Sequence, residues 1–529
     1  MSQRLADVLE GYLDLRWRIN PVEGTYVGRH EFDTELPRFD PASIREYIAA
    51  LRAYTSSLEE VEAETLDDEI DQTAALHAAR HDLLVLERER PHARNPSYAL
   101  FHALNAIHLL LVRSSNNEAR RTSALLARVR ALPRFLDEAA VALTEPRAVF
   151  FETARAMVDG GVALIREALT RTKFPGTDPM ELAAARDAAV DALHRYADAL
   201  TVLEARADGA VGIGRDLFDL KLHTAHMIRE NADELLRFGE RLRAEAVAEL
   251  EGLAAQLHPG KSWRDVVRIL REDTPTRDTA LEEYRLAMRA AHEFTAEQGL
   301  VTVPEGELVV TPTPDFLRAI IPFAAYQGPP AFEGDSRGTF FVTLPLPGEP
   351  WRLHCRAELP STALHEGVPG HHLQIVTANG LQRTVRRVLS SPIAQEGWAL
   401  YCENLMAEHG FIRDPAARFF QTHHLLWRAL RVILDVSLHT KGMTVDKATA
   451  ILRDELSLEE SAARAEAVRY CAFPTYQLCY AVGRRDILRL REDARAARGA
   501  SFSLRDFHDE LLAYGALPTP LARWGMGLA

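Results

Sequence analysis

The segment HEGVPGHH, residues 365–372, carries side chains that could bind a catalytic metal ion. Zinc hydrolases commonly use two histidine ligands, a third protein ligand, an open position for water and a carboxylate base. The familiar helical arrangement places the histidines at i and i+4, with a glutamate at i+1. His365 and Glu366 begin that pattern, but Pro369 occupies the i+4 position. The alternative interpretation is a polar junction between two helices without a metal; the three histidines favour the metal site.

The two remaining histidines lie beyond the usual spacing. His371 and His372 follow His365 at i+6 and i+7. On an uninterrupted helix His371 would point about 120° away from His365, and His372 would lie roughly 10 Å further along the axis. Proline removes a backbone donor and glycine permits unusual backbone angles, so both interrupt helices. We therefore predict that Gly367 to Gly370 form a bulge or tight turn that aims a histidine at the metal. Spacing alone does not choose between His371 and His372.

A second segment, QEGWALYCE at residues 395–403, offers the third ligand. Glu396 precedes a glycine that would allow another backbone to approach, and it begins an apolar helical run. We predict Glu396 as the third ligand and Glu366 as the general base. Glu403 lies seven residues after Glu396 and could share its helical face, where it would orient a histidine ligand. The alternative for Glu396 is an ordinary salt-bridged acid on a helix.

Polar residues in a later apolar stretch could support this site. Arg431, Asp435 and His439 stand at successive i+4 positions and share one helical face. Asp435 and His439 could anchor a ligand histidine or contact the substrate. A structural ion-pair ladder is an equally acceptable interpretation.

Tyr480 is the candidate donor to the oxyanion that develops during amide hydrolysis. Arg469 and Arg484 flank it in sequence and could bind a peptide carboxylate. Each of these three residues could instead have a structural role in an amphipathic helix. His372, if it is not a ligand, is a candidate substrate contact.

The elements that must position these residues are mostly helical. Apolar residues recur at three- and four-residue spacing through about residue 300, and again from about Ser361 to the end. We therefore predict a mainly α fold with a deep central cleft and a small β-sheet near the active site. We assign residues 1–300 to a helical scaffold half that forms a channel wall. Residues 301–529 would be the catalytic half, within one continuous structural unit.

Two short β-prone pieces interrupt the helical pattern, at Glu307–Thr311 and Gly338–Leu344. The second piece could belong to a small structural hairpin. It could also be an edge strand that pairs with an extended peptide near the active site.

The composition excludes several classes of protein. The 529 residues are 47% hydrophobic and 26% charged with a net charge of −14, which is ordinary for a soluble globular protein. No long Lys/Arg block indicates nucleic acid binding. No apolar window approaches the roughly 18 to 20 residues of a membrane span, and no secretory signal is recognisable. Four scattered cysteines indicate reduced thiols. We expect a cytoplasmic protein without a membrane or nucleic acid partner; its oligomeric state is not indicated.

The chain resembles the family catalogued as domain of unknown function 885, over nearly its whole length. The strongest part of the resemblance is carried by HEGVPGHH at 365–372, EGWALYCE at 396–403, RVILDVSLH at 431–439, RY at 469–470, QLCYAVGR at 477–484 and FHDELLAYGALP at 507–518. Near the N-terminus, the segment from Asn20 to Gly28 and the pair Leu36-Pro37 also fit. Members of this family look like helical gluzincin metallopeptidases, in which a downstream glutamate is the third zinc ligand.

This resemblance implies zinc ligands at His365, His371 and Glu396, with one Zn²⁺ per chain and Glu366 as the base. The segment before Tyr480 departs from the family pattern. Family members usually read Pro-Gly-Gln there, whereas this chain has Pro-Thr-Tyr-Gln at residues 474–477. The resemblance therefore does not assign the oxyanion donor.

These observations together predict a zinc-dependent hydrolase that cleaves peptide bonds of short or unfolded peptides, as a carboxypeptidase or an oligopeptidase. One alternative is a zinc amidohydrolase that acts on a small non-peptide amide. The other is a non-catalytic helical binding protein with a vestigial metal site.

Overall fold

The computed structural model describes residues 2–112, 117–314, 318, 321, 323–334, 336–349, 351 and 354–528. The chain divides into two compact units, which are each described by themselves. The first unit comprises Met1–Thr65, Ala75–Val211 and Pro314–Ile320, and the second comprises Leu66–Ala74, Gly212–Thr313 and Ile321–Ala529. The assignment of residues 1–300 and 301–529 to a scaffold half and a catalytic half stays a prediction.

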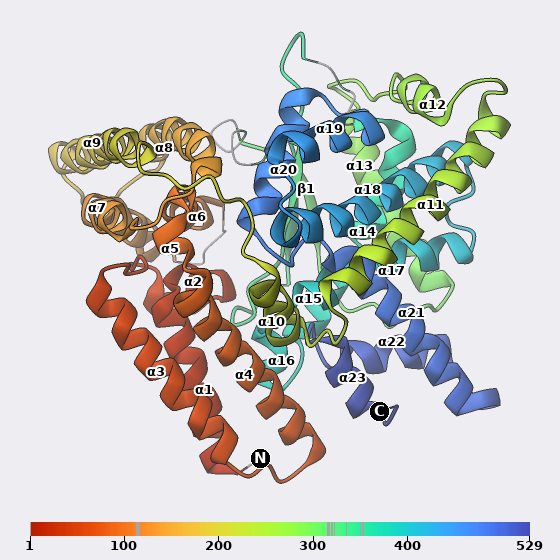
Figure 1. Cartoon of the computed structure of the whole chain (residues 1–529), viewed down its shortest axis with the longest axis horizontal. Helices are drawn as coiled ribbons and strands as arrows, with labels where there is room; N and C mark the ends of the chain where they lie inside the picture. Colours follow the sequence, from red (N-terminus) through yellow and green to blue (C-terminus); the bar gives the residue numbers. More distant parts are fainter. Residues whose placement is uncertain are drawn as a thin grey trace. The chain divides into compact units, whose positions relative to one another are not determined.

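The first unit is helical (Figure 1). Its helices are α1 (Gln3–Ile19), α2 (Pro21–Val27), α3 (Pro41–Glu60), α5 (Pro91–Arg94), α6 (Pro96–Val112), α7 (Glu118–Ala142), α8 (Phe151–Arg171) and α9 (Pro179–Glu204), with the part of α4 (Leu66–Leu84) from Ala75 onward. Arg128 of α7 is fully buried and donates to the carbonyl oxygen of Ala106 at 2.7 Å and of Phe32 at 3.2 Å. A buried guanidinium stabilises a fold only when its donors are satisfied, so these contacts tie α6 and α7 to the N-terminal segment.

The second unit contains the segments from which a metal site was predicted. Its helices are α10 (Arg215–His226), α11 (Ala232–Leu257), α12 (Trp263–Leu270), α13 (Ala280–Glu297), α14 (Leu359–Glu366), α15 (His371–Asn379), α16 (Thr384–Val388), α17 (Pro392–Glu408), α18 (Pro415–Thr440), α19 (Val445–Leu456), α20 (Glu460–Ala472), α21 (Cys479–Arg498), α22 (Leu504–Leu512) and α23 (Thr519–Gly525).

Two long helix pairs form the core of the second unit. Helix α18 packs along α11, and α17 packs along α21. The apolar stretch of α18 is buried, with Val432 and Val436 in one cluster with Leu478 and Val482. Burial of apolar side chains on these faces supplies the main stabilisation. The polar residues of α17 and α18 are therefore held on a rigid support.

A three-stranded sheet lies in the second unit, with strand order β1-β3-β2. Strand β1 (Leu308–Pro312) pairs with β3 (Gly338–Val342) in parallel, and β2 (Ala324–Gln327) pairs with β3 in antiparallel fashion. Tyr284 and Met288 of α13 pack against its buried side chains. The prediction of a mainly α fold with a small sheet is confirmed.

The interpretation of Gly338–Leu344 as an edge strand is wrong. Strand β3 is central, because β1 and β2 occupy its two sides. Strand β2 was missed because it has only four residues, all half-buried, and so lacks a clear alternating pattern. Within the described part of the chain, no helix has the length and apolar character needed to cross a membrane.

Candidate metal centre

The predicted interruption of the metal-binding segment is present. Helix α14 ends at Glu366 and α15 begins at His371, with the four residues between them outside both helices. The backbone N–H of Gly370 donates to the carbonyl oxygen of Leu364 at 3.0 Å, which closes the turn. The peptide bond between Val368 and Pro369 is cis. The break therefore lets two helices supply one histidine each.

The break depends on a glycine and on contacts from α17. A Cβ atom at Gly370 would lie 2.0 Å from the carbonyl oxygen of His365, so that no larger residue fits. Trp398 donates its indole Nε1–H to the carbonyl oxygen of Pro369 at 2.8 Å, and the Cys402 thiol lies 3.5 Å from the same oxygen. Helix α17 thus holds the turn in place while it also carries Glu396.

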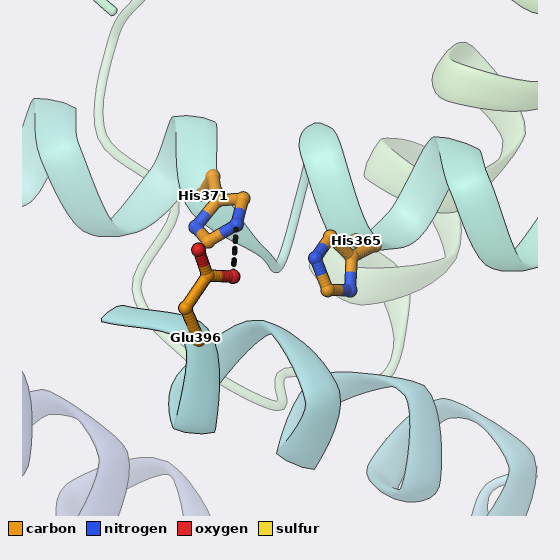
Figure 2. Close-up of side chains that lie close together, drawn as sticks. All are labelled: His365, His371 and Glu396. Carbon is orange, nitrogen blue, oxygen red and sulfur yellow. Dashed lines mark ion pairs between the residues drawn. The ribbon is translucent and has the colours of Figure 1, made fainter. Parts of the chain in front are cut away.

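Three side chains from α14, α15 and α17 converge, as Figure 2 shows. His365, His371 and Glu396 each offer one ligand atom, and these atoms all lie within 4.8 Å of one another. The two imidazole rings stand nearly perpendicular, with centroids 4.9 Å apart. His371, and not His372, faces this cluster.

His365 is oriented by Glu403, as its position on α17 suggested. Glu403 Oε1 lies 2.8 Å from His365 Nδ1, and both side chains are buried. A carboxylate at Nδ1 favours the tautomer with a proton on that nitrogen, and leaves Nε2 with a lone pair that could bind a metal ion. Glu403 lies two turns after Glu396 on the same helix, so one face of α17 serves both roles.

Glu396 is held by a second contact that the sequence did not indicate. The Tyr476 hydroxyl donates to Glu396 Oε1 at 2.6 Å, while Glu396 Oε2 lies 3.4 Å from His371 Nε2. Burial alone would raise the pKa of Glu396, but His371, His365 and the Tyr476 hydroxyl lower it to about 2. The pKa of His371 is raised overall, because the neighbouring Glu396 carboxylate outweighs burial, which by itself lowers it. An anionic carboxylate beside two imidazoles is suited to a divalent cation.

The donor set and its spacing fit zinc. Zinc binds nitrogen and oxygen ligands at roughly 2.0–2.2 Å in tetrahedral sites, so two of its ligands lie roughly 3.3–3.6 Å apart. The 3.4 Å between His371 Nε2 and Glu396 Oε2 matches this separation. Two histidines and one glutamate are a ligand set of catalytic zinc sites, which keep a further position open.

Glu366 is the last residue of α14 and follows His365 directly. Its side chain is half-buried, and within the described ranges its carboxylate makes no hydrogen bond or ion pair. Its charge acts on His371, because it contributes to the raised pKa of that imidazole. The carboxylate is therefore near the candidate ligands and is not engaged by another described residue.

His372 lies on a different side of α15 from His371. Its Nδ1 is 2.9 Å from the hydroxyl of Tyr326 on β2, and the two rings meet edge to face. A Cβ atom at Gly338 would lie 2.7 Å from the same nitrogen. His372 thus joins α15 to the sheet, and the structure does not bring it into the cluster.

Asp435 and His439 support the segment that carries Tyr476. The Asp435 carboxylate accepts from the backbone N–H groups of Thr475 at 3.1 Å and Leu478 at 3.3 Å. His439 Nε2 lies 3.1 Å from the carbonyl oxygen of Tyr470 and 3.7 Å from Asp435. Neither residue touches a candidate ligand. Their contacts with the 470–478 segment position Tyr476 against Glu396.

The structure separates the two predicted arginines. Arg484 donates to the amide oxygen of Asn404 at 2.6 Å and lines a cavity of about 70 Å³ together with Glu403. Arg484 therefore lies close to Glu403, the carboxylate that orients His365. Arg469 instead forms an ion pair with Glu466 at 2.8 Å.

Tyr480 lies next to Tyr476, with ring centroids 6.1 Å apart in an edge-to-face arrangement. Burial and the Glu396 charge raise the pKa of Tyr480, so its hydroxyl stays protonated and can donate a hydrogen bond. Tyr476 precedes Tyr480 by four residues. Tyr476 lies in the turn before α21, so no helical spacing indicated it, and sequence reasoning did not single it out as a functional residue.

Comparisons with known proteins bear on the fold and the family. A structure from Shewanella oneidensis, of a protein of unknown function provisionally named a lipoprotein, aligns with a TM-score of 0.82 and 22% identity. It covers 99% of each chain. A provisionally named lipoprotein from Colwellia psychrerythraea aligns with a TM-score of 0.85 and 17% identity, over 99% of this chain and 98% of that one. At this level of identity the likeness shows the fold. No curated protein matches the chain.

Both of these proteins are named as lipoproteins, a name that does not fit the cytoplasmic location predicted for this chain. The cytoplasmic location stays a prediction. The family described as "Bacterial protein of unknown function (DUF885)" matches residues 21–526, which is nearly the whole chain. The chain therefore belongs to the DUF885 family.

Proposed function

We propose that this protein is a zinc-dependent hydrolase that cleaves peptide bonds of short or unfolded peptides. The observation that carries the proposal is the convergence of His365, His371 and Glu396, with His365 oriented by Glu403 at 2.8 Å. A buried carboxylate on the distal nitrogen of a ligand histidine is the usual support of a catalytic zinc site. A cytoplasmic location and a deep cleft that admits the peptide remain part of the proposal.

Zinc, when held by these three side chains, would supply a Lewis acid that activates water and polarises the peptide carbonyl. The Glu366 carboxylate takes the proton from the attacking water and passes it to the leaving amine. The Tyr480 hydroxyl donates a hydrogen bond to the oxygen that becomes negative as the carbonyl is attacked. Tyr476 keeps Glu396 in the orientation that faces His371.

The proposal is tested by Glu366→Gln, which keeps the side-chain shape but removes the base. We expect the purified wild-type chain to contain one zinc ion by elemental analysis and to cleave members of a peptide library, as read by mass spectrometry. Glu366→Gln should keep the zinc and lose activity by roughly 10²- to 10⁴-fold. Glu297→Gln, on an exposed position at the end of α13, should retain both zinc and activity.

Peptidase activity that survives Glu366→Gln with zinc still bound would contradict the assignment of the base. Activity confined to small non-peptide amides, independent of peptide length, would identify an amidohydrolase instead. A chain that binds no metal, or whose metal is removed only by unfolding, would indicate a non-catalytic protein.

A further inference from the structure

We infer that Arg428, together with Arg431 and Arg469, forms a carboxylate-binding site beside the metal centre that receives the C-terminal carboxylate of the peptide. This inference rests on the proposed hydrolase function and deepens it, because it makes the protein a carboxypeptidase rather than an endopeptidase.

The positive charge of the three arginines exceeds the negative charge of the one carboxylate, Glu466, that contacts them. Arg469 donates to both Glu466 oxygens at 2.8 and 2.9 Å, and Arg431 Nη2 lies 3.4 Å from Glu466 Oε2. Arg431 also donates to the Tyr470 hydroxyl at 3.2 Å. One carboxylate thus serves two guanidinium groups, and a partly buried excess of positive charge is costly unless an anion joins it.

Arg428 has the least compensated charge of the three. Its Nη1 donates only to the carbonyl oxygen of His424, at 3.4 Å, and its Nε is buried without a partner among the described residues. Those residues provide no carboxylate within ion-pair distance of it. The Glu358 carboxylate interacts with Arg428 through its charge, but it pairs with Arg271 at 3.7 Å and lies 3.9 Å from His424. A half-buried guanidinium with open donors is suited to an incoming carboxylate.

The arginines adjoin the metal centre through two tyrosines. The Arg431 and Arg428 guanidinium carbons lie 4.7 and 5.7 Å from the centre of the Tyr480 ring. Tyr480 contacts Tyr476, whose hydroxyl donates to Glu396 at 2.6 Å. Contact with an aromatic face holds a guanidinium in a defined position. The guanidinium groups of Arg428 and Arg431 are therefore connected to a proposed zinc ligand through two tyrosines in contact.

This placement suits a peptide that ends close to the cleaved bond. A guanidinium binds a carboxylate through two parallel hydrogen bonds, which fixes position as well as charge. An interior peptide segment presents no backbone charge to such a group. Substrates with a free C-terminus would therefore gain a contact that longer chains passing through the site lack.

The test measures binding rather than turnover. The probes are N-acetyl-tetraalanine, its C-terminal amide, and the same amide with aspartate in place of the third alanine. Each is titrated calorimetrically into Glu366→Gln, first loaded with zinc and then after zinc removal by a chelator. We expect the free acid to bind roughly 10- to 100-fold more tightly than the simple amide in both states, as for a hydrogen bond to a charged group.

Arg428→Gln should abolish this preference, and Arg428→Lys should retain part of it, because lysine keeps the charge without the paired donors. A partial preference in Arg428→Lys would show that the loss in Arg428→Gln comes from the missing contact and not from misfolding. Circular dichroism checks that both variants are folded. Arg268→Gln is the matched control: Arg268 lies on α12, is 71% exposed and pairs with Asp265 of its own helix. It should leave the preference unchanged.

Equal binding of acid and amide would overturn the inference, as would a preference that survives Arg428→Gln. A preference that disappears with the zinc would mean that the carboxylate binds the metal. Tight binding of the aspartate amide would assign the arginines to an acidic side chain instead. Hydrolysis of acids and amides at equal rates by the wild-type protein, measured separately, would leave the proposed hydrolase intact and remove only this inference. Arginine-dependent binding of the free acid without any hydrolysis by the wild-type protein would leave the carboxylate-binding site intact and remove the proposed hydrolase.

Discussion

Gly397 of α17 and Gly483 of α21 touch backbone to backbone: a Cβ atom on Gly397 would lie 2.5 Å from the Cα atom of Gly483. The two helices can pack this closely only because both positions lack a side chain. Glu396 directly precedes Gly397, and Tyr476 lies just before α21. The approach of these helices therefore sets the distance between the candidate ligand and the tyrosine that holds it.

Gly397→Ala should move α17 away from α21. We expect it to lower the free energy of unfolding by about 1–3 kcal/mol, as for other overpacked positions, and to weaken zinc binding because Glu396 moves with the helix. Gly252→Ala is the control, since Gly252 is exposed on α11 and a Cβ atom there would contact nothing within 4 Å. It should be neutral or stabilising in chemical denaturation. Equal stability of the two variants would contradict the close packing.

Glu403→Ala should weaken zinc binding without removing a ligand. The His365 ring would lose the carboxylate at its Nδ1 and with it the fixed tautomer. We expect roughly 10- to 100-fold weaker binding in competition with a chromophoric chelator. Glu408→Gln, on the same helix but paired with Arg491, should bind zinc as the wild type does. Unchanged affinity in Glu403→Ala would refute the orienting role.

Tyr476→Phe and Tyr480→Phe should have different effects. Loss of the Tyr476 hydroxyl removes a 2.6 Å hydrogen bond to Glu396, so zinc affinity should fall by roughly 10-fold. Tyr480→Phe should keep the zinc affinity and lower kcat by roughly 10²- to 10³-fold, as for loss of an oxyanion donor. If Tyr476→Phe lowers kcat more than Tyr480→Phe while zinc stays bound, the two roles are exchanged.

Zinc removal should lower thermal stability. A ligand that binds only the folded chain stabilises it by about 2.7 kcal/mol at 100 times its Kd. We expect chelator-treated protein to have a lower Tm that zinc restores and that calcium does not, because calcium prefers oxygen ligands. His371→Ala should show no zinc-dependent change in Tm. A zinc effect of full size in that variant would place the metal elsewhere.

Asp435 should make stability depend on pH. Burial raises its pKa from 3.8 to about 7, so the folded chain keeps a proton that the unfolded chain releases. The contribution of the protonated Asp435 side chain to the free energy of unfolding is therefore fully present below pH 4 and is lost as the pH rises towards 7. Asp435→Asn cannot ionise, so the stability of the wild type relative to this variant should fall between pH 5 and pH 8. Chemical denaturation of the zinc-free wild type and of Asp435→Asn at pH 5 and at pH 8 measures this difference in stability. The same difference at both pH values would contradict the raised pKa.

The sequence alone was sufficient for the features that depend on neighbouring residues. Helical periodicity indicated a mainly α chain, and the Pro369-Gly370 pair indicated a break, because both act on the local backbone. The spacing of Glu396 and Glu403, two helical turns apart, indicated a shared face. These are properties of a few consecutive residues and need no tertiary contacts.

Only the tertiary structure decided which residues meet across the chain. It placed His371 in the cluster and joined His372 to Tyr326 of β2, a choice that the spacing had left open. It made β3 a central strand and brought Tyr476 to Glu396, 80 residues away. Such contacts depend on how helices and strands pack, and no local pattern encodes that packing. The residue types at the site were therefore readable from the sequence, whereas their partners were not.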